Sequence, residues 1–207
     1  SDYGGNLGVA GNDINVTGDF SWNSGAYNGG SSINTFRRNV LLDGGSFTAT
    51  SSTLYHNSSL SGSGTMFRVG ATSFDHNNGT FETAGTYTHT IDVPSAATFH
   101  NFNINYYGSA SLTVPASDTL IINGGLSMSG GAFSGGTIDL NGTLVSSSTS
   151  GSGTLLLDGD ISGNPQTINF SENISLPNVN IKKGTVNASA STTNFSSYAG
   201  LTVGEEG

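Results

Sequence analysis

Apolar and polar residues alternate along short stretches of this chain, and three of these stretches are nearly the same. They read TLIING at residues 119–124, TIDLNG at 137–142 and TLLLDG at 154–159. In each copy the second and fourth residues are apolar, which is the period of a β-strand with one buried face. Each copy ends in Asn-Gly or Asp-Gly, pairs that favour turns because they tolerate a positive φ. The pattern predicts a strand followed by a tight corner.

The spacing of these copies indicates how the strands are arranged. Gly124 and Gly142 are 18 residues apart, and Gly142 and Gly159 are 17 apart. A strand and corner at nearly constant spacing is typical of a solenoid, in which each coil stacks on the previous one. Equivalent side chains are then expected to align, forming a buried core column and a corner ladder of hydrogen-bonding side chains: Ile122, Leu140 and Leu157 in the column, and Asn123, Asn141 and Asp158 in the ladder.

The predicted fold class is therefore all-β, a parallel β-helix of stacked coils. A β-sandwich is the structural alternative, because short strands with regular turns also suit it. No helical periodicity competes, since glycine interrupts every candidate window.

A longer repeat suggests the domain organisation. Residues 16–30 align without gaps on residues 122–136. We expect residues 1–12 to be a glycine-rich N-terminal segment or linker. Residues 13–207 are expected to form a single solenoid of two multi-coil modules, 13–118 and 119–194, and the start of a third.

Strings such as LIINGGLSMSGGAFSGGTIDLNGTL, at residues 120–144, resemble the repetitive β-solenoid stretches of secreted bacterial surface proteins of the filamentous-haemagglutinin and autotransporter-passenger kind. The resemblance is one of style and covers most of residues 13–203. It implies a right-handed parallel β-helix, an extracellular or cell-surface location and a stalk or adhesive role. It implies no catalytic residue.

Composition narrows the possible partners. The chain has 207 residues, 34% hydrophobic and only 9% charged, with 31 glycines and a formal net charge of −9. So acidic a surface repels phosphate backbones, which argues against nucleic acid as a partner. No apolar run approaches the roughly 20 residues of a membrane helix. Cysteine is absent, so no disulfide or thiolate metal site exists. We expect no cofactor and no metal.

Acidic residues are the first candidates for chemistry. Asp118, Asp139 and Asp160 follow one another at intervals of 21 residues, close to the length of a coil. Carboxylates stacked on adjacent rungs could act as an acid/base pair or bind calcium. The favoured interpretation is solvent-facing strand and turn aspartates, because Asp139 alternates with apolar neighbours.

Histidines and aromatic residues offer weaker signals. The four histidines, His56, His76, His89 and His100, are expected on the surface or in turns. Trp22, Tyr27 and Phe133 could form a sugar-stacking platform, but their exchange for other apolar residues between the aligned copies suits core packing better. Tyr106 and Tyr107 are adjacent, so at least one of them should be exposed in a strand. This pair is the best local candidate for a contact surface.

The sequence favours a non-enzymatic extracellular structural rod, part of a surface adhesin or of a self-assembling fibre. Neither terminus resembles a cap, so the chain is expected either to continue into further coils of a longer protein or to self-associate end to end by strand addition. Surface glycans are a possible second partner. The alternative function is a carbohydrate-binding or polysaccharide-degrading β-helix protein.

Overall fold

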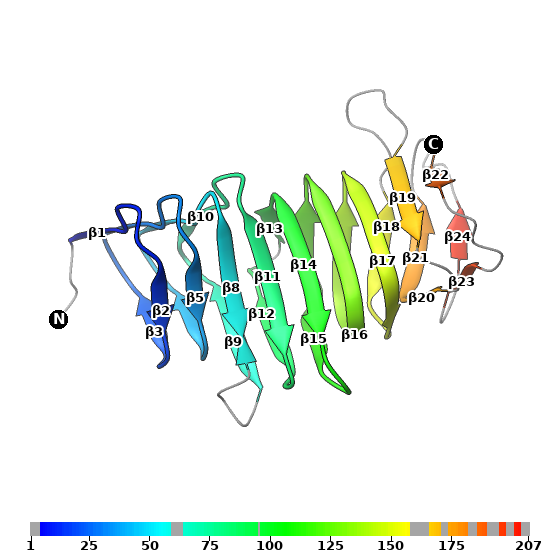
Figure 1. Ribbon diagram of the computed structural model, residues 1–207, viewed down its shortest axis with the longest axis horizontal. Helices are drawn as coiled ribbons and strands as arrows, with labels where there is room; N and C mark the ends of the chain where they lie inside the picture. The colour runs from blue at the N-terminus through cyan, green and yellow to red at the C-terminus, as the bar shows by residue number, and fades with distance from the viewer. Residues whose placement is uncertain are drawn as a thin grey trace.

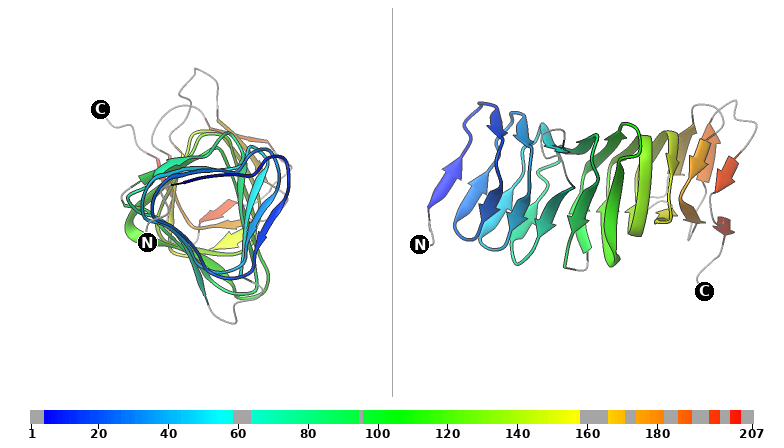
Figure 2. Two further views of the ribbon diagram at one scale, coloured as in Figure 1. Left: turned by 90° about the vertical axis from the view of Figure 1, so that its left-hand side faces the viewer. Right: turned by 90° about the horizontal axis from the view of Figure 1, so that it is seen from below.

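The chain winds into a β-solenoid of about seven turns (Figure 1). The computed structural model describes residues 5–58, 64–94, 96–157, 166–170, 174–181, 186–189, 195–197 and 201–203. These residues form no α-helix. Viewed along its axis, the rod has a roughly triangular outline, because each coil consists of three strand segments joined by corners (Figure 2).

The strands stack into three faces, which we call A, B and C. Face A contains β2 (Ile14–Val16), β5 (Asn34–Phe36), β8 (Thr53–Asn57), β11 (Thr80–Gly85), β14 (Asn101–Tyr106), the starts of β16 (Gly125–Leu140) and β17 (Thr143–Ser150), β19 (Gln166–Phe170) and β22 (Val186–Ser189). Face B contains β3 (Phe20–Trp22), β6 (Val40–Leu42), β9 (Thr65–Val69), β12 (His89–Asp92), the start of β15 (Ser111–Ile122) and the middle of β16.

Face C contains β1 (Asn6–Gly8), β4 (Ala26–Asn28), β7 (Ser46–Thr48), β10 (Ser73–Asp75), β13 (Ala96–Phe99), the ends of β15 and β16, β18 (Thr154–Leu157), β21 (Asn178–Ile181) and β24 (Leu201–Val203). The short strands β20 (Ile174–Leu176) and β23 (Phe195–Ser197) pair with each other. Every strand pair in the described part of the chain is parallel. A β-sandwich built from hairpins requires antiparallel pairs, so that alternative is wrong.

The three similar sequence stretches lie on top of one another in face C. Thr119 is in register with Thr137, and Thr137 with Thr154. The same pairing aligns Ile122 with Leu140 and Leu140 with Leu157, and all three side chains are buried. Side chains of similar shape thus fill the same place in consecutive coils, about 4.8 Å apart.

Aromatic rings form the N-terminal part of the same column. Tyr27 and Phe47 are in register and stack with ring centroids 4.4 Å apart. Phe47 stacks on Phe74 at 6.1 Å, and Phe74 contacts Phe99 at 5.4 Å. Phe99 is in register with Ile122. The core of face C is therefore aromatic in the first coils and aliphatic in the later ones.

The corner glycines are required for a reason other than the one the sequence suggested. A positive φ was expected at the Asn-Gly corners, but neither Gly124 nor Gly142 has one. A Cβ atom on Gly142 would lie 1.6 Å from the carbonyl oxygen of Gly124, and one on Gly124 would lie 2.5 Å from Oδ1 of Asn101. Glycine is needed because the backbone of one corner packs directly on the corner before it.

The long repeat relates strands on different faces. Phe20 lies in β3 of face B, whereas its aligned counterpart Leu126 lies in the face A part of β16. The alignment thus reflects the strand-and-corner pattern that all faces share, and its offset is not a whole number of coils. Within residues 1–12, β1 pairs with β4 and so continues face C.

Replacing Leu140 by Asp should unfold the central coils, because it buries an unpaired charge where a leucine is completely enclosed. Leu140→Ala should cost about 2–5 kcal/mol of unfolding free energy. Replacing the half-buried neighbour Asp139 by Ser is the control and should cost less than about 1 kcal/mol. Thermal and urea unfolding measure all three, and equal effects of the changes at positions 139 and 140 would contradict the assigned inward register.

Gly142→Ala should destabilise the rod strongly, because the new methyl group would overlap the carbonyl of Gly124 in the neighbouring coil. Gly125→Ala is the matched control. A Cβ atom there meets its nearest neighbours at 3.5 Å, which is ordinary van der Waals contact. Urea midpoints of the two variants should therefore differ clearly, and similar midpoints would argue against close packing at this corner.

Candidate functional site

The two adjacent tyrosines that the sequence singled out, at the end of β14, differ in their exposure to solvent. Tyr106 is the last inward-facing residue of the strand and is only 3% exposed, whereas Tyr107 is 63% exposed. The amide of Tyr107 donates to the carbonyl oxygen of Gly85, which holds the backbone against the preceding coil. Of the predicted pair, only Tyr107 has a side chain that a partner can contact.

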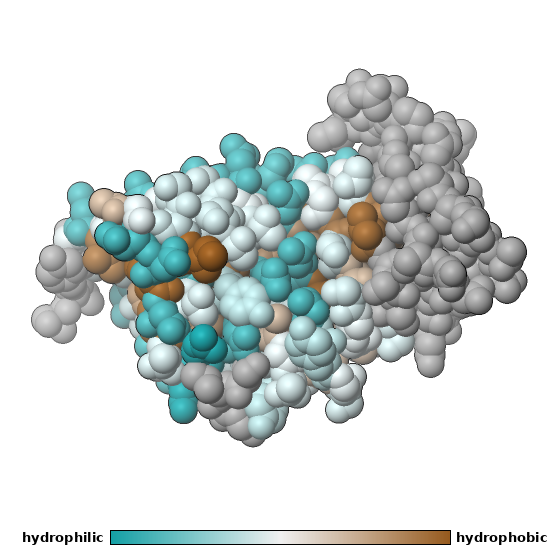
Figure 3. Space-filling model, in the orientation of Figure 1, coloured by the Kyte–Doolittle hydropathy of each residue, from teal (hydrophilic) through white to brown (hydrophobic). Residues whose placement is uncertain are grey.

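The outer surface of face A carries a shallow groove of about 250 Å³. It crosses four rungs, from β11 through β14 and β16 to β17. Two rows of outward residues form it, together with the floor residue Leu126: Thr80, Asn101, Gly125 and Thr143 in one row, and Asn103, Ser127 and Val145 in the other. We call these eight residues the face A groove. The side of the rod shown in Figure 3 is mostly pale to hydrophilic, with hydrophobic colour confined to a few places.

Side chains of β14 organise the polar part of this surface. Asn101, Asn103 and Asn105 alternate with buried residues and all face outward. Oδ1 of Asn101 accepts a hydrogen bond from the amide of Gly125 at 2.8 Å. Nδ2 of Asn103 donates to Glu82 at 3.3 Å. The side-chain atoms Nδ2 of Asn101 and Oδ1 of Asn103 take no part in these two bonds, so they are available to a ligand.

The predicted corner ladder lies between faces C and A. Nδ2 of Asn141 donates to Oδ1 of Asn123 across one rung at 3.2 Å. Asp158, the third predicted member, lies outside the described residues. Toward the N-terminus the same corner carries two stacked imidazoles, His76 and His100, with ring centroids 5.8 Å apart. The corner is thus lined by stacked polar side chains over several coils.

A small cavity lies beside these stacked histidines. Its volume of about 10 Å³ has room for about one water molecule. Thr50, His76, His100 and Asn101 contribute to its lining. The cavity is too small for an organic ligand.

Of the three candidate aspartates, the two that the structure describes do not form a stacked site. Asp118 was expected to face solvent, but it is 5% exposed and accepts hydrogen bonds from the amide of Val93 and the hydroxyl of Ser117, both at 3.0 Å. It serves to satisfy a buried backbone group. Asp139 has Ile121 and Leu156 as its neighbours in register. Because the coils here are 18 and 17 residues long, the 21-residue spacing does not align the carboxylates. Asp160 lies outside the described residues.

Two histidines contradict the surface expectation. His56 and His89 are fully buried in the core, with ring centroids 4.6 Å apart. Nε2 of His56 donates to the carbonyl oxygen of Arg38 at 2.9 Å. The alternating pattern of β8 contained the signal, since His56 occupies the position that Phe36 has one coil earlier.

This histidine pair lies in a buried polar cluster. The ring centroids of Tyr106 and His89 lie 5.3 Å apart, and Thr65 is in register with His89. Within the described residues, both ring nitrogens of His89, Nδ1 of His56 and Oγ1 of Thr65 lack a well-formed hydrogen bond. Burial lowers the pKa of His56 to about 4; burial and the neighbouring His56 lower the pKa of His89 to about 2. Both rings are therefore neutral at pH 7.

The aromatic residues weighed as a sugar platform are part of the core. Trp22, Tyr27 and Phe133 are 8%, 2% and 0% exposed. They cannot stack against a ligand on the surface.

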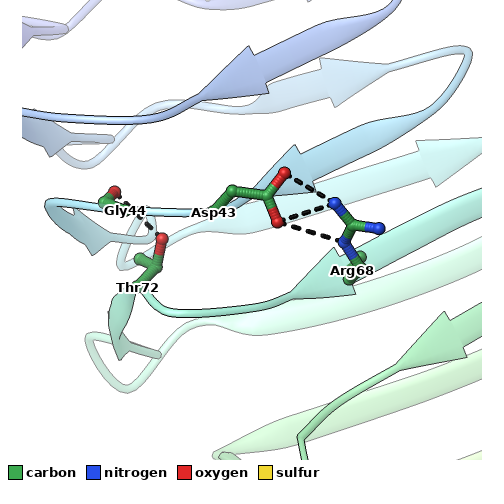
Figure 4. Close-up of polar contacts among 4 residues, drawn as sticks. All are labelled: Asp43, Gly44, Arg68 and Thr72. Carbon is green, nitrogen blue, oxygen red and sulfur yellow. Dashed lines mark hydrogen bonds and ion pairs between the residues drawn. The ribbon is translucent and has the colours of Figure 1, made fainter.

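An ion pair joins two coils on face B (Figure 4). The guanidinium of Arg68 makes a two-pronged contact with the carboxylate of Asp43, with an Nη2–Oδ2 distance of 2.6 Å. The hydroxyl of Thr72 donates to the carbonyl oxygen of Gly44 in the same region. The hydrogen bond and charge of Asp43 raise the pKa of Arg68. Both charged side chains are more than one-third exposed, so the pair contributes little stability, and it serves to connect neighbouring coils.

No protein-family model, curated protein or solved structure matches this chain. Within the residues that the structure describes, no group of three or more His, Asp or Glu side chains is arranged to hold a metal ion. The same residues include no helix with the length and hydropathy needed to cross a membrane. The outer surface of face A is the best candidate for a functional contact.

The buried histidines should make the rod sensitive to acid. In the unfolded chain a histidine gains its proton near pH 6.5, whereas in the fold the pKa values are about 4 and about 2. The unfolded state then binds more protons below pH 6.5, so stability falls as the pH decreases from 6.5 toward 4. At pH 5 each histidine should cost roughly 2 kcal/mol of unfolding free energy relative to pH 7.5.

Urea unfolding at the two pH values measures this loss. His89→Leu should reduce the loss, because the next residue in register at this position is already leucine, Leu112. His100→Gln, a change at the corner, is the control and should retain the acid sensitivity. An unchanged pH dependence in His89→Leu would contradict the role of the buried pair.

Proposed function

We propose that this chain is a non-enzymatic, extracellular structural rod, part of a surface adhesin or of a self-assembling fibre. The observation that carries the proposal is the set of parallel hydrogen-bond ladders between successive coils. They run through the described rungs of faces A and B, and along face C from β1 to β10 and again from β13 to β24. Such a chain extends a fixed surface along one axis, which suits a stalk or spacer. The low-charge surface rich in Ser, Thr and Asn supports an exposed, extracellular position.

The enzymatic alternative is less well supported. A polysaccharide-degrading β-helix needs two carboxyl groups close together at its substrate. In the described part of the chain, Asp118 is buried against backbone and Asp139 lies between apolar neighbours in register. We therefore assign no catalytic residue in this proposal. Incubation with polysaccharides should release no oligosaccharides, and release that Asp139→Asn abolishes would overturn the non-enzymatic role.

Self-association is the second part of the proposal. Among the described strands, β1, β2 and β3 pair on one side only, with β4, β5 and β6. Their other edges present unpaired backbone groups, which can accept a strand from another chain. Leu7 in β1 is 43% exposed, and Ile14 and Phe20 of the same coil are only partly buried. This coil therefore offers both hydrogen bonds and apolar surface to a second copy.

Electron microscopy and light scattering over a range of concentrations test the assembly. The wild-type chain should form filaments or larger species as its concentration increases. Leu7→Lys should reduce assembly, because it places a charge on the open edge. Ile33→Lys is the matched control: Ile33 is 46% exposed but lies outside β1, β2 and β3, so this change should leave assembly intact. Dispersed monomers of the wild-type chain at high concentration would contradict self-association.

A further inference from the structure

The face A groove is open because one position lacks a side chain that the fold would accept. Gly125 lies at the centre of the groove, between Asn101 and Thr143. A Cβ atom on Gly125 would meet Oδ1 of Asn101 and Oγ1 of Thr143 at 3.5 Å, and its backbone does not need a positive φ. Gly124, one residue earlier, is by contrast forced by close backbone packing. The packing of the coils therefore does not explain Gly125, and its effect is to deepen the groove.

The groove has the chemistry of a site for hydroxyl groups. Its lining combines the amides of Asn101 and Asn103 with the hydroxyls of Thr80, Ser127 and Thr143. Amides and hydroxyls both donate and accept hydrogen bonds. The apolar part that a ligand can reach is Val145, which is 51% exposed, whereas Leu126 beneath the groove is buried in the core. No residue of the lining is charged.

The dimensions suit a chain molecule that lies along the rod axis. The groove crosses four rungs, which corresponds to about 14 Å at a rung spacing of about 4.8 Å. Beyond Asn103, the next outward residues in register toward the N-terminus are Glu82 and then Tyr55. The half-buried side chain of Tyr55 therefore extends the surface in the same line and adds an aromatic residue to it.

We propose that the face A groove binds a neutral polysaccharide chain aligned with the rod axis. The hydroxyl groups of the sugars would pair with the amides and hydroxyls of the two rows, and the apolar face of a sugar ring would contact Val145. This binding site is independent of the proposed self-association, which uses the open edge of the first coil.

Two other occupants fit less well. An extended peptide adds to a sheet through an unpaired edge, but β11, β14 and the face A part of β16 are each paired on both sides. An anionic polysaccharide would find no basic side chain in the lining, would lie near Glu82 and would face a chain with a net charge of −9. A neutral glycan avoids both difficulties.

Affinity electrophoresis of the full chain in gels containing single polysaccharides tests the proposal. Neutral glucans, mannans, galactans and xylans form one set of probes, and polygalacturonate and a sulfated glycan form the other. We expect at least one neutral polysaccharide to retard the wild-type chain, and the anionic ones to leave it unretarded. Ser127→Tyr fills the groove from an outward position, and it should weaken binding at least tenfold.

A pair of substitutions on one strand provides the matched control. Asn103→Ala removes an amide of the lining and should weaken binding about tenfold, whereas Asn105→Ala removes an outward amide two residues along β14 and outside the groove, and should leave binding unchanged. Circular dichroism and urea unfolding check that each variant remains folded. The proposal is overturned if no neutral polysaccharide binds, if only anionic ones bind, or if a folded Ser127→Tyr variant binds as the wild type does.

Discussion

The parallel hydrogen-bond ladder between successive coils is the interaction on which the rest of this structure depends. Most strands pair with the strand before and the strand after them along the rod, so the register of one coil fixes the register of the next. Residues at equivalent positions must therefore have compatible shapes, as in the column of Phe99, Ile122 and Leu140. The same closeness excludes a side chain at Gly142, because the backbone of the neighbouring corner occupies that space.

Two buried polar positions in the core of face A differ in how well their hydrogen bonds are satisfied. Asn34 is buried but well satisfied: it accepts from the hydroxyl of Tyr27 and donates to the carbonyl oxygens of Gly29 and Ser32. One coil later along the rod, His56 and its partner His89 are incompletely paired. Because stability in a repeat fold is the sum of local terms, such a cluster makes one region weaker than its neighbours.

Outward side chains do not pack in the core, so the fold places few constraints on them and they can bind other molecules. Outward residues on β14 are amides whose hydrogen bonds connect neighbouring rungs, and small residues on β16 leave the space beside them open. The rod that we propose uses the ladders between successive coils, and the glycan site that we propose uses this outer surface. The two roles are compatible because the ladders involve the backbone and the groove involves outward side chains.

The sequence by itself determined the strands, the corners and the local spacing of the coils, because alternation and turn residues are properties of a few neighbouring positions. It identified the column of Ile122, Leu140 and Leu157 in this way. The assignment of strands to faces depended on the tertiary structure, since all three faces share one pattern; the 106-residue alignment of Phe20 with Leu126 accordingly joined two different faces. Tertiary structure also decided that Tyr106 is buried and Tyr107 exposed, and that His56 and His89 meet in the core. The face A groove depends entirely on the tertiary structure, because residues from four separate strands become neighbours only when the coils stack.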